Sequence, residues 1–472
     1  MDNELLIKIV ENAGDQGLDT DKARKEYEPE HHKIFDPVLR PKKKVTKPTG
    51  EKDGNGEEIM QTTMEEVNRT AIPLQKLIVK RRVAFMNVGE ITLIAKPDGD
   101  QEQALLDLVN KIREDNKLRF KENEVARRMC SELQVAKLWY TDLEGDERQV
   151  RLKILSPALG DELLPVFDSF GKMVYFGRKY EAKRDFTQIT EWVDGMEKPI
   201  EHFDIYSEDR IMKFEKEQGK EWVLAEAVPN PFEKIPVSYY SLKETPWNDV
   251  QPIIERLEEL VSNFGDTNDY NGSPILAVTG KIEGFSAKGE RGKILEIGKD
   301  AKVEYVTWAH APEAIKLEME TLTDLIYTCT QTPNISLEKL SGLGDLSGVA
   351  FDRVFLDAHL AAKAMIDDVY GECTQRDINI LKRAAVLIDP SLKPVENMDI
   401  WADIPLYRVN DVQETINMLM GANGGKPVLS QETSAKLVAG QQGLDPGDEW
   451  DLMKKEADTL GDELDNEPGM VP

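Results

Sequence analysis

The amino-acid sequence predicts an α+β protein with several successive segments, and three observations lead to this class. Long stretches carry apolar residues at three- and four-residue steps, which is the spacing of one face of an α-helix. Between residues 147 and 242, short runs rich in β-branched and aromatic residues are separated by Gly, Asp and Pro, as in an antiparallel sheet. Further strand-like runs lie at 273–308, between two helical stretches. With 472 residues, of which 40% are hydrophobic, the chain can bury several cores.

Residues 1–67 are expected to be irregular and to form a flexible N-terminal arm. The stretch "PVLRPKKKVTKPTGEKDGNGEE" (37–58) combines Pro, Gly and charge with few apolar residues. Its lysines at 42, 43, 44 and 47 could touch nucleic acid, although a solvated loop is the simpler interpretation. The apolar run Leu5–Val10 is too short for a signal peptide, and no later run reaches the roughly 18 apolar residues that a membrane span requires.

Order is expected to begin at "IPLQKLIVKRRVAFMNVGEITLI" (72–94), a helix followed by an extended segment. Residues 103–140 are predicted to be mostly helical, because apolar side chains recur there at helical spacing. These positions are Leu105, Leu106, Val109, Ile112, Val125, Met129, Leu133 and Ala136. The runs that follow, such as "RQVRLKILSP", "KMVYFGRKYEA", "TQITEWVDG" and "HFDIYS", favour strands that end near "NPFEKIPVSYYSL" (230–242).

The next stretch, 247–270, predicts an amphipathic helix with Asn248 as its N-cap. Its apolar stripe is Val250, Ile253, Ile254, Leu257, Leu260, Val261 and Phe264. Residues 273–308 then alternate strand-like runs with glycine turns and predict a small β module. Residues 312–332 return to helix and stop at Pro333. The apolar face of that helix is expected to hold Ile315, Met319, Leu322, Ile326 and Cys329.

The stretch "SLEKLSGLGDLSGVAF" (336–351) places three glycines in front of a very long helical pattern at 347–388. That pattern predicts a helix of roughly 40 residues, about 60 Å long, with a kink at Gly371. A strand is expected at 398–411, and short helices and an acidic tail after it. The glycine spacing resembles a nucleotide-binding loop, but such a loop follows a buried strand, and here a helix precedes it.

Charge and chemistry exclude several function classes. The chain holds 88 acidic and 60 basic residues, a net charge of −28, which argues against a surface that grips nucleic acid. Cys130, Cys329 and Cys373 are widely spaced and are expected to be reduced, packed thiols of an intracellular protein. The histidines, at 31, 32, 202, 310 and 359, do not fall in metal-ligand spacing, so no metal and no cofactor is expected. Carboxylate pairs are too numerous to be diagnostic, and an enzyme is a weak hypothesis.

Several stretches resemble the portal proteins of long-tailed double-stranded DNA phages, in the order of that family. They are 72–93, "NPFEKIPVSYY" (230–240), 247–280, 335–363 and "INMLMGANGGKPVLSQETS" (416–434). The resemblance implies an elongated portal fold. Its parts would be a flexible arm 1–67, a wing 68–246, stem helix 1 at 247–272, a clip 273–309, stem helix 2 at 310–333, a tunnel loop 334–348, a long spine helix 349–388, a wing return strand 389–412, and a helical crown with the acidic tail at 413–472.

The resemblance also implies a function without catalysis. Portals of this type form a ring, usually of twelve subunits, at one capsid vertex in the virion. Double-stranded DNA is driven through the ring by the terminase large subunit, and a head-completion or adaptor protein binds later. Major capsid and scaffolding proteins would be further partners, with assembly in the cytoplasm of the bacterial host and no membrane involved. The alternative from another class is an intracellular nucleotide- or ligand-processing enzyme that uses the 342–348 glycine loop.

Two sets of site residues follow from the resemblance. The tunnel loop would approach DNA through Leu337, Glu338, Lys339, Leu340, Ser341, Gly342, Leu343, Gly344, Asp345, Leu346, Ser347 and Gly348. The clip would dock the terminase or adaptor through Lys281, Glu283, Lys288, Glu290, Arg291 and Lys293. Glycine suits a loop that changes shape as DNA slides past. In a ring, Lys339 would recur in every subunit as a cationic girdle. An acidic or neutral channel would repel DNA toward the axis and keep friction low.

Overall fold

The computed structural model describes most of the chain and divides it into two compact units. These units are Met1–Lys339 with Phe355–Tyr407, and Leu340–Val354 with Arg408–Pro472. The description leaves out residue 1, single positions at 53, 55, 57 and 218, residues 145–146, 183–198, 272–274, 280–281, 286–294, 298–301, 307–310, 335–354 and 408–429, and most of 431–472. The second unit is therefore largely outside the described residues, as are the predicted strand at 187–195 and most of the predicted C-terminal helices.

The N-terminal segment is not irregular, so the prediction for 1–67 is wrong. Helix α1 (Asn3–Gly14) buries Leu6, Ile7 and Val10 against a sheet. Gly177 permits this close packing, since a Cβ there would lie 2.6 Å from Val10 Cγ1. Helix α2 (Thr20–Tyr27) follows, and strands β1 (Lys43–Lys52) and β2 (Glu58–Glu65) pair as an antiparallel hairpin. The Pro- and Gly-rich composition of 37–58 reflects this exposed hairpin, and it says nothing about the amphipathic α1.

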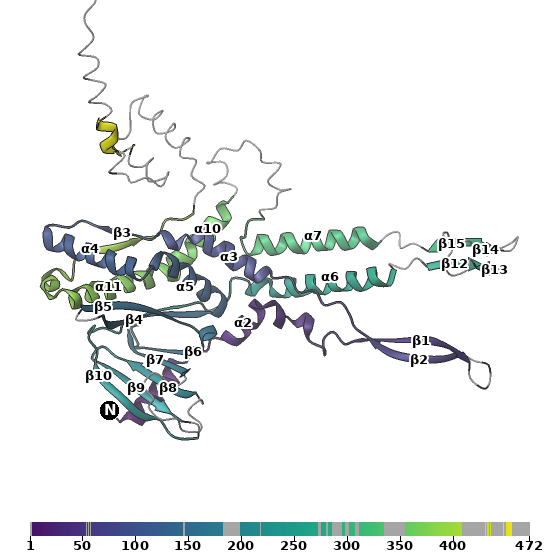
Figure 1. Cartoon of the computed structure of the whole chain (residues 1–472), viewed down its shortest axis with the longest axis horizontal. Coiled ribbons are helices and arrows are strands. Elements are labelled where there is room, and N and C mark those ends of the chain that lie inside the picture. The colour runs from purple at the N-terminus through teal and green to yellow at the C-terminus, as the bar shows by residue number, and fades with distance from the viewer. Residues whose placement is uncertain are drawn as a thin grey trace, which may run out of the picture. The chain divides into compact units, whose positions relative to one another are not determined.

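The predicted antiparallel strands form two larger sheets, which confirms the α+β class (Figure 1). One has the order β10-β9-β8-β7-β6, with bounds Asp161–Phe167 for β6, Met173–Ala182 for β7, Ile200–Tyr206 for β8, Arg210–Lys216 for β9 and Val223–Pro229 for β10. The other has the order β11-β4-β5, with bounds Gln134–Glu144 for β4, Glu147–Leu155 for β5 and Val237–Ser241 for β11.

Helices cover the three-stranded sheet. The predicted helix at 72–94 is α3 (Leu74–Met86), followed by strand β3 (Thr92–Ala95). The predicted stretch 103–140 is α4 (Asp100–Asp115) and α5 (Leu118–Glu132), and then β4. The predicted stripe of α4 is buried at Leu105, Val109 and Ile112, in one core with Trp139 of β4. A long helix later in the chain closes the same core.

That long helix changes its hydrogen-bonding pattern just before Gly371, the position at which the sequence predicts a kink. It runs as α10 (Leu356–Met365), a π-helical turn (Ile366–Tyr370) and α11 (Gly371–Ile388). The extra residue of a π turn shifts the helix face, and such turns often mark a functional position. Strand β16 (Ile400–Asp403) then pairs with β3 and is shorter than the predicted strand at 398–411. The start of the predicted helix, 347–354, lies outside the described residues.

A buried polar network joins α5, β4 and α11. Lys137 is fully buried, with its Nζ 2.7 Å from Glu122 Oε1 and 3.0 Å from Asp377 Oδ2. Asp377 also accepts hydrogen bonds from Trp139 Nε1 (2.6 Å) and from the Ser238 hydroxyl (2.9 Å). Burial by itself disfavours the ammonium, but Asp377 and Glu122 outweigh it and raise the pKa of Lys137. The lysine therefore stays charged and holds three segments together.

The predicted helices on either side of the small β module are both confirmed. Helix α6 is Gln251–Asn271, preceded by a single 3₁₀ turn at Asn248–Val250, and α7 is Ala311–Cys329. Between them the chain forms β12 (Ile275–Thr279), β13 (Ile282–Phe285), β14 (Leu295–Ile297) and β15 (Lys302–Val306). β12 pairs with β15 and β13 with β14, both antiparallel. The module is thus two nested hairpins.

Candidate functional site

Most of the predicted site residues lie outside the described part of the chain. The proposed tunnel loop 337–348 falls within 335–354, and Lys281, Lys288, Glu290, Arg291 and Lys293 fall in the gaps between the strands of the β module. Glu283 alone among the named clip residues lies on a described element, strand β13. The structure does describe the helices from which both segments emerge. These helices and their supports define the candidate site.

Helices α6 and α7 pack side by side (Figure 1). Of the predicted α6 stripe, Ile254, Leu257 and Leu260 are buried. Arg256 of α6 donates to Glu318 of α7 at 2.9 Å, an exposed pair that aligns the helices more than it stabilises them. The α7 face is less covered, because only Ile326 of its stripe is fully buried. Cys329 is exposed, so the prediction that it packs with this stripe is wrong.

The polar face of α6 is covered by the N-terminal segment through buried groups. His32 Nδ1 lies 2.6 Å from Glu258 Oε1, and both side chains are 2% exposed. Burial opposes the charged imidazole, but the hydrogen bond to Glu258 outweighs this effect and raises the pKa of His32. Glu258 Oε1 also accepts the Ile72 backbone N–H at 2.8 Å. His32 therefore lies buried against α6, within the segment that the sequence predicts to be a flexible arm.

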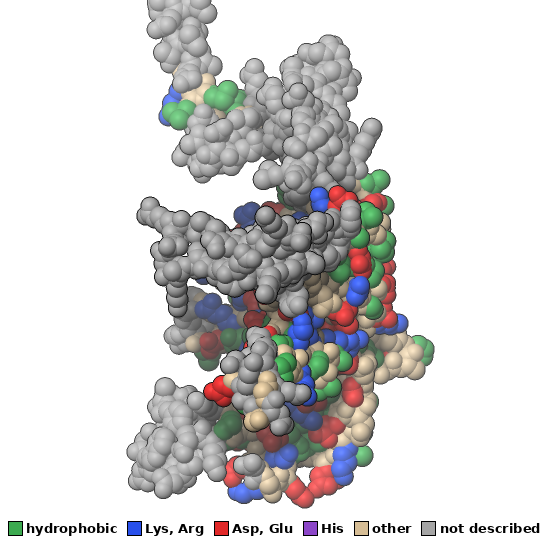
Figure 2. All heavy atoms as spheres, turned by 90° about the vertical axis from the view of Figure 1, so that its right-hand side faces the viewer, with side chains coloured by type: hydrophobic (Ala, Val, Ile, Leu, Met, Phe, Trp, Pro, Cys, Tyr) green, Lys and Arg blue, Asp and Glu red, His purple; other side chains and the backbone are tan. Residues whose placement is uncertain are grey.

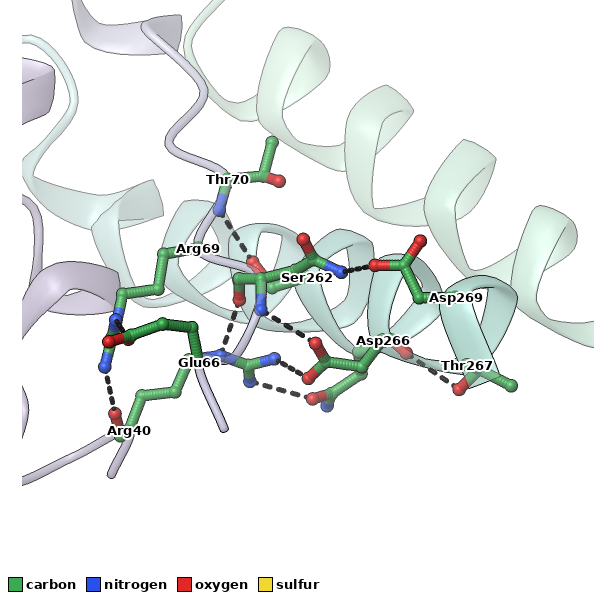
Figure 3. A network of polar contacts seen from close by, with 10 residues as sticks. Arg40, Glu66, Arg69, Thr70, Ser262, Asp266, Thr267 and Asp269 are labelled. Atoms are coloured by element: carbon green, nitrogen blue, oxygen red, sulfur yellow. Dashed lines mark hydrogen bonds and ion pairs between the residues drawn. The ribbon is translucent and has the colours of Figure 1, made fainter. Parts of the chain in front are cut away.

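Arg40, just before the β1–β2 hairpin, is the centre of a second set of contacts on α6 (Figure 3). Its guanidinium donates to Asp266 Oδ2 (2.6 Å) and Asn263 Oδ1 (2.8 Å). A third bond goes to the Asn68 backbone oxygen at 2.8 Å, on the other side of the hairpin. Asn68 itself donates to Asp269 at 2.7 Å. Both ends of the hairpin are therefore tied to each other and to α6.

The chain that leaves the hairpin adds further contacts at the base of the hairpin, and we call this set of contacts the root. The Thr70 N–H donates to the buried Ser262 hydroxyl at 2.9 Å, and Arg69 donates to the Arg40 carbonyl oxygen at 2.8 Å. Lys42 and Arg69 both pair with Glu66. Beyond the root, β1 and β2 contact chiefly each other. Of the lysines singled out in the sequence, Lys42, Lys43 and Lys44 therefore lie at the base of this hairpin, and Lys47 lies midway along β1.

The end of α7 is held by α3. Arg82 donates to the Thr330 carbonyl oxygen at 2.7 Å and to the Ala361 carbonyl oxygen at 3.2 Å. Arg81 donates to the Pro333 carbonyl oxygen, and its guanidinium lies over the Tyr327 ring. A cation at a helix C-terminus is favourable because the last carbonyl groups lack intrahelical partners. The two arginines therefore hold the chain where it enters 335–354 and where it resumes as α10.

Phe85 of α3 contacts the described residues next to two segments that the structure leaves out, Phe355 after 335–354 and Tyr407 before 408–429. Its ring contacts Phe355, at 5.6 Å between centroids, and His359, at 5.3 Å. Tyr407, the last described residue before 408–429, packs on the same ring and donates its N–H to the Phe85 oxygen at 3.1 Å. His359 Nε2 lies 2.7 Å from the Tyr407 oxygen. His359 is therefore packed between Phe85 and Tyr407.

Two further observations concern the described residues alone. His, Cys, Asp and Glu side chains there do not gather into a group that could hold a metal ion. None of the helices described is long and apolar enough to span a membrane. Figure 2 shows acidic and basic side chains interspersed over the described part of one face.

Comparison with known proteins identifies the family. The family described as "Phage portal protein, SPP1 Gp6-like" matches residues 21–462. The chain belongs to this family of phage portal proteins, which confirms the resemblance seen in the sequence and favours a structural role over the enzyme alternative. No curated protein matches the sequence significantly.

Three solved structures are remotely similar, and all come from gene transfer agent (GTA) particles. The first, the neck of an empty particle computed with C6 symmetry, has 12% identity and a TM-score of 0.40, covering 79% of this chain and 91% of its own. The second, the virion of a native particle, has 12% identity and a TM-score of 0.37, with coverages of 79% and 89%. The third, the neck of a native particle computed with C12 symmetry, has 11% identity and a TM-score of 0.40, with coverages of 77% and 88%.

Proposed function

We propose that copies of this chain form a ring, of twelve subunits, at one capsid vertex and that double-stranded DNA passes through it during packaging and ejection. Family membership over residues 21–462 supports this role. The observation that carries it is the α6–α7 pair with the nested hairpins β12–β15 between them, which would serve as stem and clip. The clip would dock the terminase large subunit first and a head-completion or adaptor protein later. Capsid and scaffolding proteins would surround the ring in the host cytoplasm and then in the virion.

The net charge of −28 supports passage of DNA without gripping. Duplex DNA carries one charge per about 1.7 Å of its axis, and a wall within about 8 Å feels that charge at physiological salt. Lysine–phosphate contacts would have to break at each step. A carboxylate-rich wall would instead centre the duplex. In this proposal the ring conducts DNA and performs no catalysis of its own.

Residues 337–348 are proposed as the loop that meets DNA. Their supports are the contacts at either end, since Arg82 binds both the end of α7 and α10. A loop between two held ends can change shape while its base stays in place. Replacing Lys339 with Ala should change packaged DNA length or DNA retention in particles. The same change at Lys220, an exposed lysine of the β9–β10 connection, should leave both unchanged. If particles of the two variants packaged and retained DNA equally well, the hypothesis of a cationic girdle at Lys339 would be refuted.

Electron microscopy of the purified full chain in negative stain tests the proposed function. We expect rings with an axial hole, and co-expressed scaffolding protein should raise their yield. ATP hydrolysis should be absent from the purified ring and appear when the terminase large subunit is added. A strictly monomeric protein under conditions in which infectious particles form would refute the ring. Hydrolysis by the chain alone would refute the non-enzymatic role.

A further inference from the structure

Three exposed apolar side chains lie at the end of the 3₁₀ turn Lys33–Phe35 and in the turn just after it. Phe35, Val38 and Leu39 are 42%, 82% and 64% exposed. The turn that presents them is ordered, because the Asp36 carboxylate accepts the Val38 N–H at 2.8 Å and the Asp36 carbonyl accepts the Arg40 N–H at 2.9 Å. We call these three residues the turn patch. Exposed apolar side chains gathered on an ordered turn are unusual for a surface that faces only water.

The turn patch is fixed to α6 at both of its ends. On one side Lys33 pairs with Glu255 at 2.9 Å. On the other side Arg40 pairs with Asp266 at 2.6 Å. Residues 33–40 therefore run along the polar face of α6 from the level of residue 255 to that of residue 266. A patch held in this way loses little conformational freedom when it binds a partner.

Helix α7 carries an uncharged stripe separate from the face that packs inward. Ala314, Leu317, Thr321 and Leu325 follow one another at steps of three and four residues, so they share one side of the helix. All four are exposed, Leu317 at 65% and Leu325 at 44%. We call them the α7 stripe. Glu313, Glu320 and Asp324 border it on one side.

The turn patch is level with the N-terminal end of the α7 stripe, and the two lie on different surfaces. The Arg256–Glu318 pair puts these two residues level, and the turn at Asn248–Val250 also contacts α7, so the helices run antiparallel. Residue 260 is then level with 314, since both are four residues from the pair. The patch lies between the levels of residues 255 and 266, so it is level with Ala314 and Leu317 but not with Thr321 or Leu325. In Figure 1 the segment between α2 and the hairpin lies on the opposite side of α6 from α7.

We propose that the turn patch of one copy packs on the α7 stripe of the next copy around the ring. This inference rests on the ring proposed above and names the surfaces that close it. Two different surfaces on one chain make a head-to-tail contact, which closes into a ring when the rotation between copies fits. Charge supports the pairing, because exposed Lys44 lies near the patch, beyond the Lys33–Glu255 and Lys42–Glu66 pairs, while carboxylates border the stripe.

Charged substitutions test the pairing. Leu39→Asp and Leu317→Asp should each weaken ring assembly about tenfold or more, because burying one leucine is worth at least that factor in an equilibrium constant. Phe170→Asp is the matched control, since Phe170 is 93% exposed and lies far from α6 along the chain, in the β6–β7 turn. Circular dichroism and thermal unfolding should be unchanged in all three variants. The readout is the concentration at which rings dissociate, measured by mass photometry.

Mixing the two variants tests the head-to-tail geometry. Each variant keeps one intact surface, so the Leu39→Asp and Leu317→Asp chains should form dimers with each other but no closed rings. If either variant formed rings at the same concentration as the wild type, with the control unchanged, the inference would be overturned while the proposed ring itself would stand. A wild-type protein that forms no ring would instead overturn the proposed function.

A cross-link keeps the proposal testable if the charged variants fail to fold. With Cys329→Ser as background, Val38→Cys combined with Leu317→Cys should give a ladder of disulfide-linked oligomers after oxidation of rings. Either cysteine alone should give no ladder. Intact rings of the double variant that yield only monomers on a non-reducing gel would overturn the pairing.

Discussion

Replacing Lys137 with Met would test the buried network beneath α11. The wild-type ammonium lies between two carboxylates, Glu122 at 2.7 Å and Asp377 at 3.0 Å, and it has no exposed surface. Methionine retains the length and the apolar stem but removes the charge. Two buried carboxylates would then remain without a cation. The packing around them would otherwise be nearly unchanged.

The expected loss of stability in Lys137→Met follows from the two carboxylates and the hydrogen bonds that remain. Removing one partner of a buried ion pair costs about 3–5 kcal/mol. Trp139, Ser238 and Tyr370 would still donate hydrogen bonds to the two carboxylates. We therefore expect the lower end, about 3 kcal/mol, in the free energy of unfolding at pH 8. Lys316→Met is the control, because that side chain is 77% exposed, and it should cost at most about 0.5 kcal/mol.

The pH dependence has a definite sign. The raised pKa of Lys137 means that its contribution to wild-type stability is complete below about pH 10 and is lost only above it. In Lys137→Met the uncompensated carboxylates take up protons more readily in the folded state, so the cost should shrink as the pH falls from 8 to 5. Urea unfolding followed by tryptophan fluorescence measures both quantities. A cost below about 1 kcal/mol at pH 8, or one independent of pH, would refute the network as described.

Three more predictions concern the supports of α6 and α7. His32→Gln should destabilise the protein more at pH 6 than at pH 9 in thermal unfolding. Because the pKa of His32 is raised, the contribution of its imidazole to stability is complete below about pH 6.5 and is lost as the pH rises through the raised value. The control His31→Gln, at an exposed histidine, should show no such trend. Arg40→Ala should speed hydrogen exchange of the β1 and β2 amides while α11 exchanges as before, and equal rates would contradict the root. Arg82→Met should make the amides of Thr330 and α10 exchange faster without lowering ring yield, and unchanged protection would show that its two carbonyl contacts do not hold the loop ends.

Local spacing was sufficient for most of the elements. The α6 stripe, the α7 helix and the nested strands between them follow from apolar periodicity and from glycine and proline positions. The same reasoning failed for residues 1–67. The Pro, Gly and charged residues of one exposed hairpin dominate the composition of a stretch that also contains α1. The helix could have been found from Leu6, Ile7 and Val10, which lie on one face.

The polar contacts that support the candidate site could not be predicted from local residue spacing. His32 and Glu258 are 226 residues apart, and Lys137 and Asp377 are 240 apart. In a chain with 88 acidic residues, a given carboxylate has no distinguishing neighbour in the sequence. Only the packing of remote segments selects which carboxylates are buried, and burial then requires that each find a partner.

The sequence by itself determined the family and, beyond residue 67, most of the order of helices and strands, because helical and strand periodicity and short family motifs are properties of neighbouring residues. The tertiary structure decided which side of α6 receives the N-terminal segment, which arginines hold the ends of the loop, and which apolar side chains stay exposed on the turn patch and the α7 stripe. These depend on distances between segments hundreds of residues apart. Periodicity shows that a helix has an apolar face, but only folding shows what covers that face and what it leaves open.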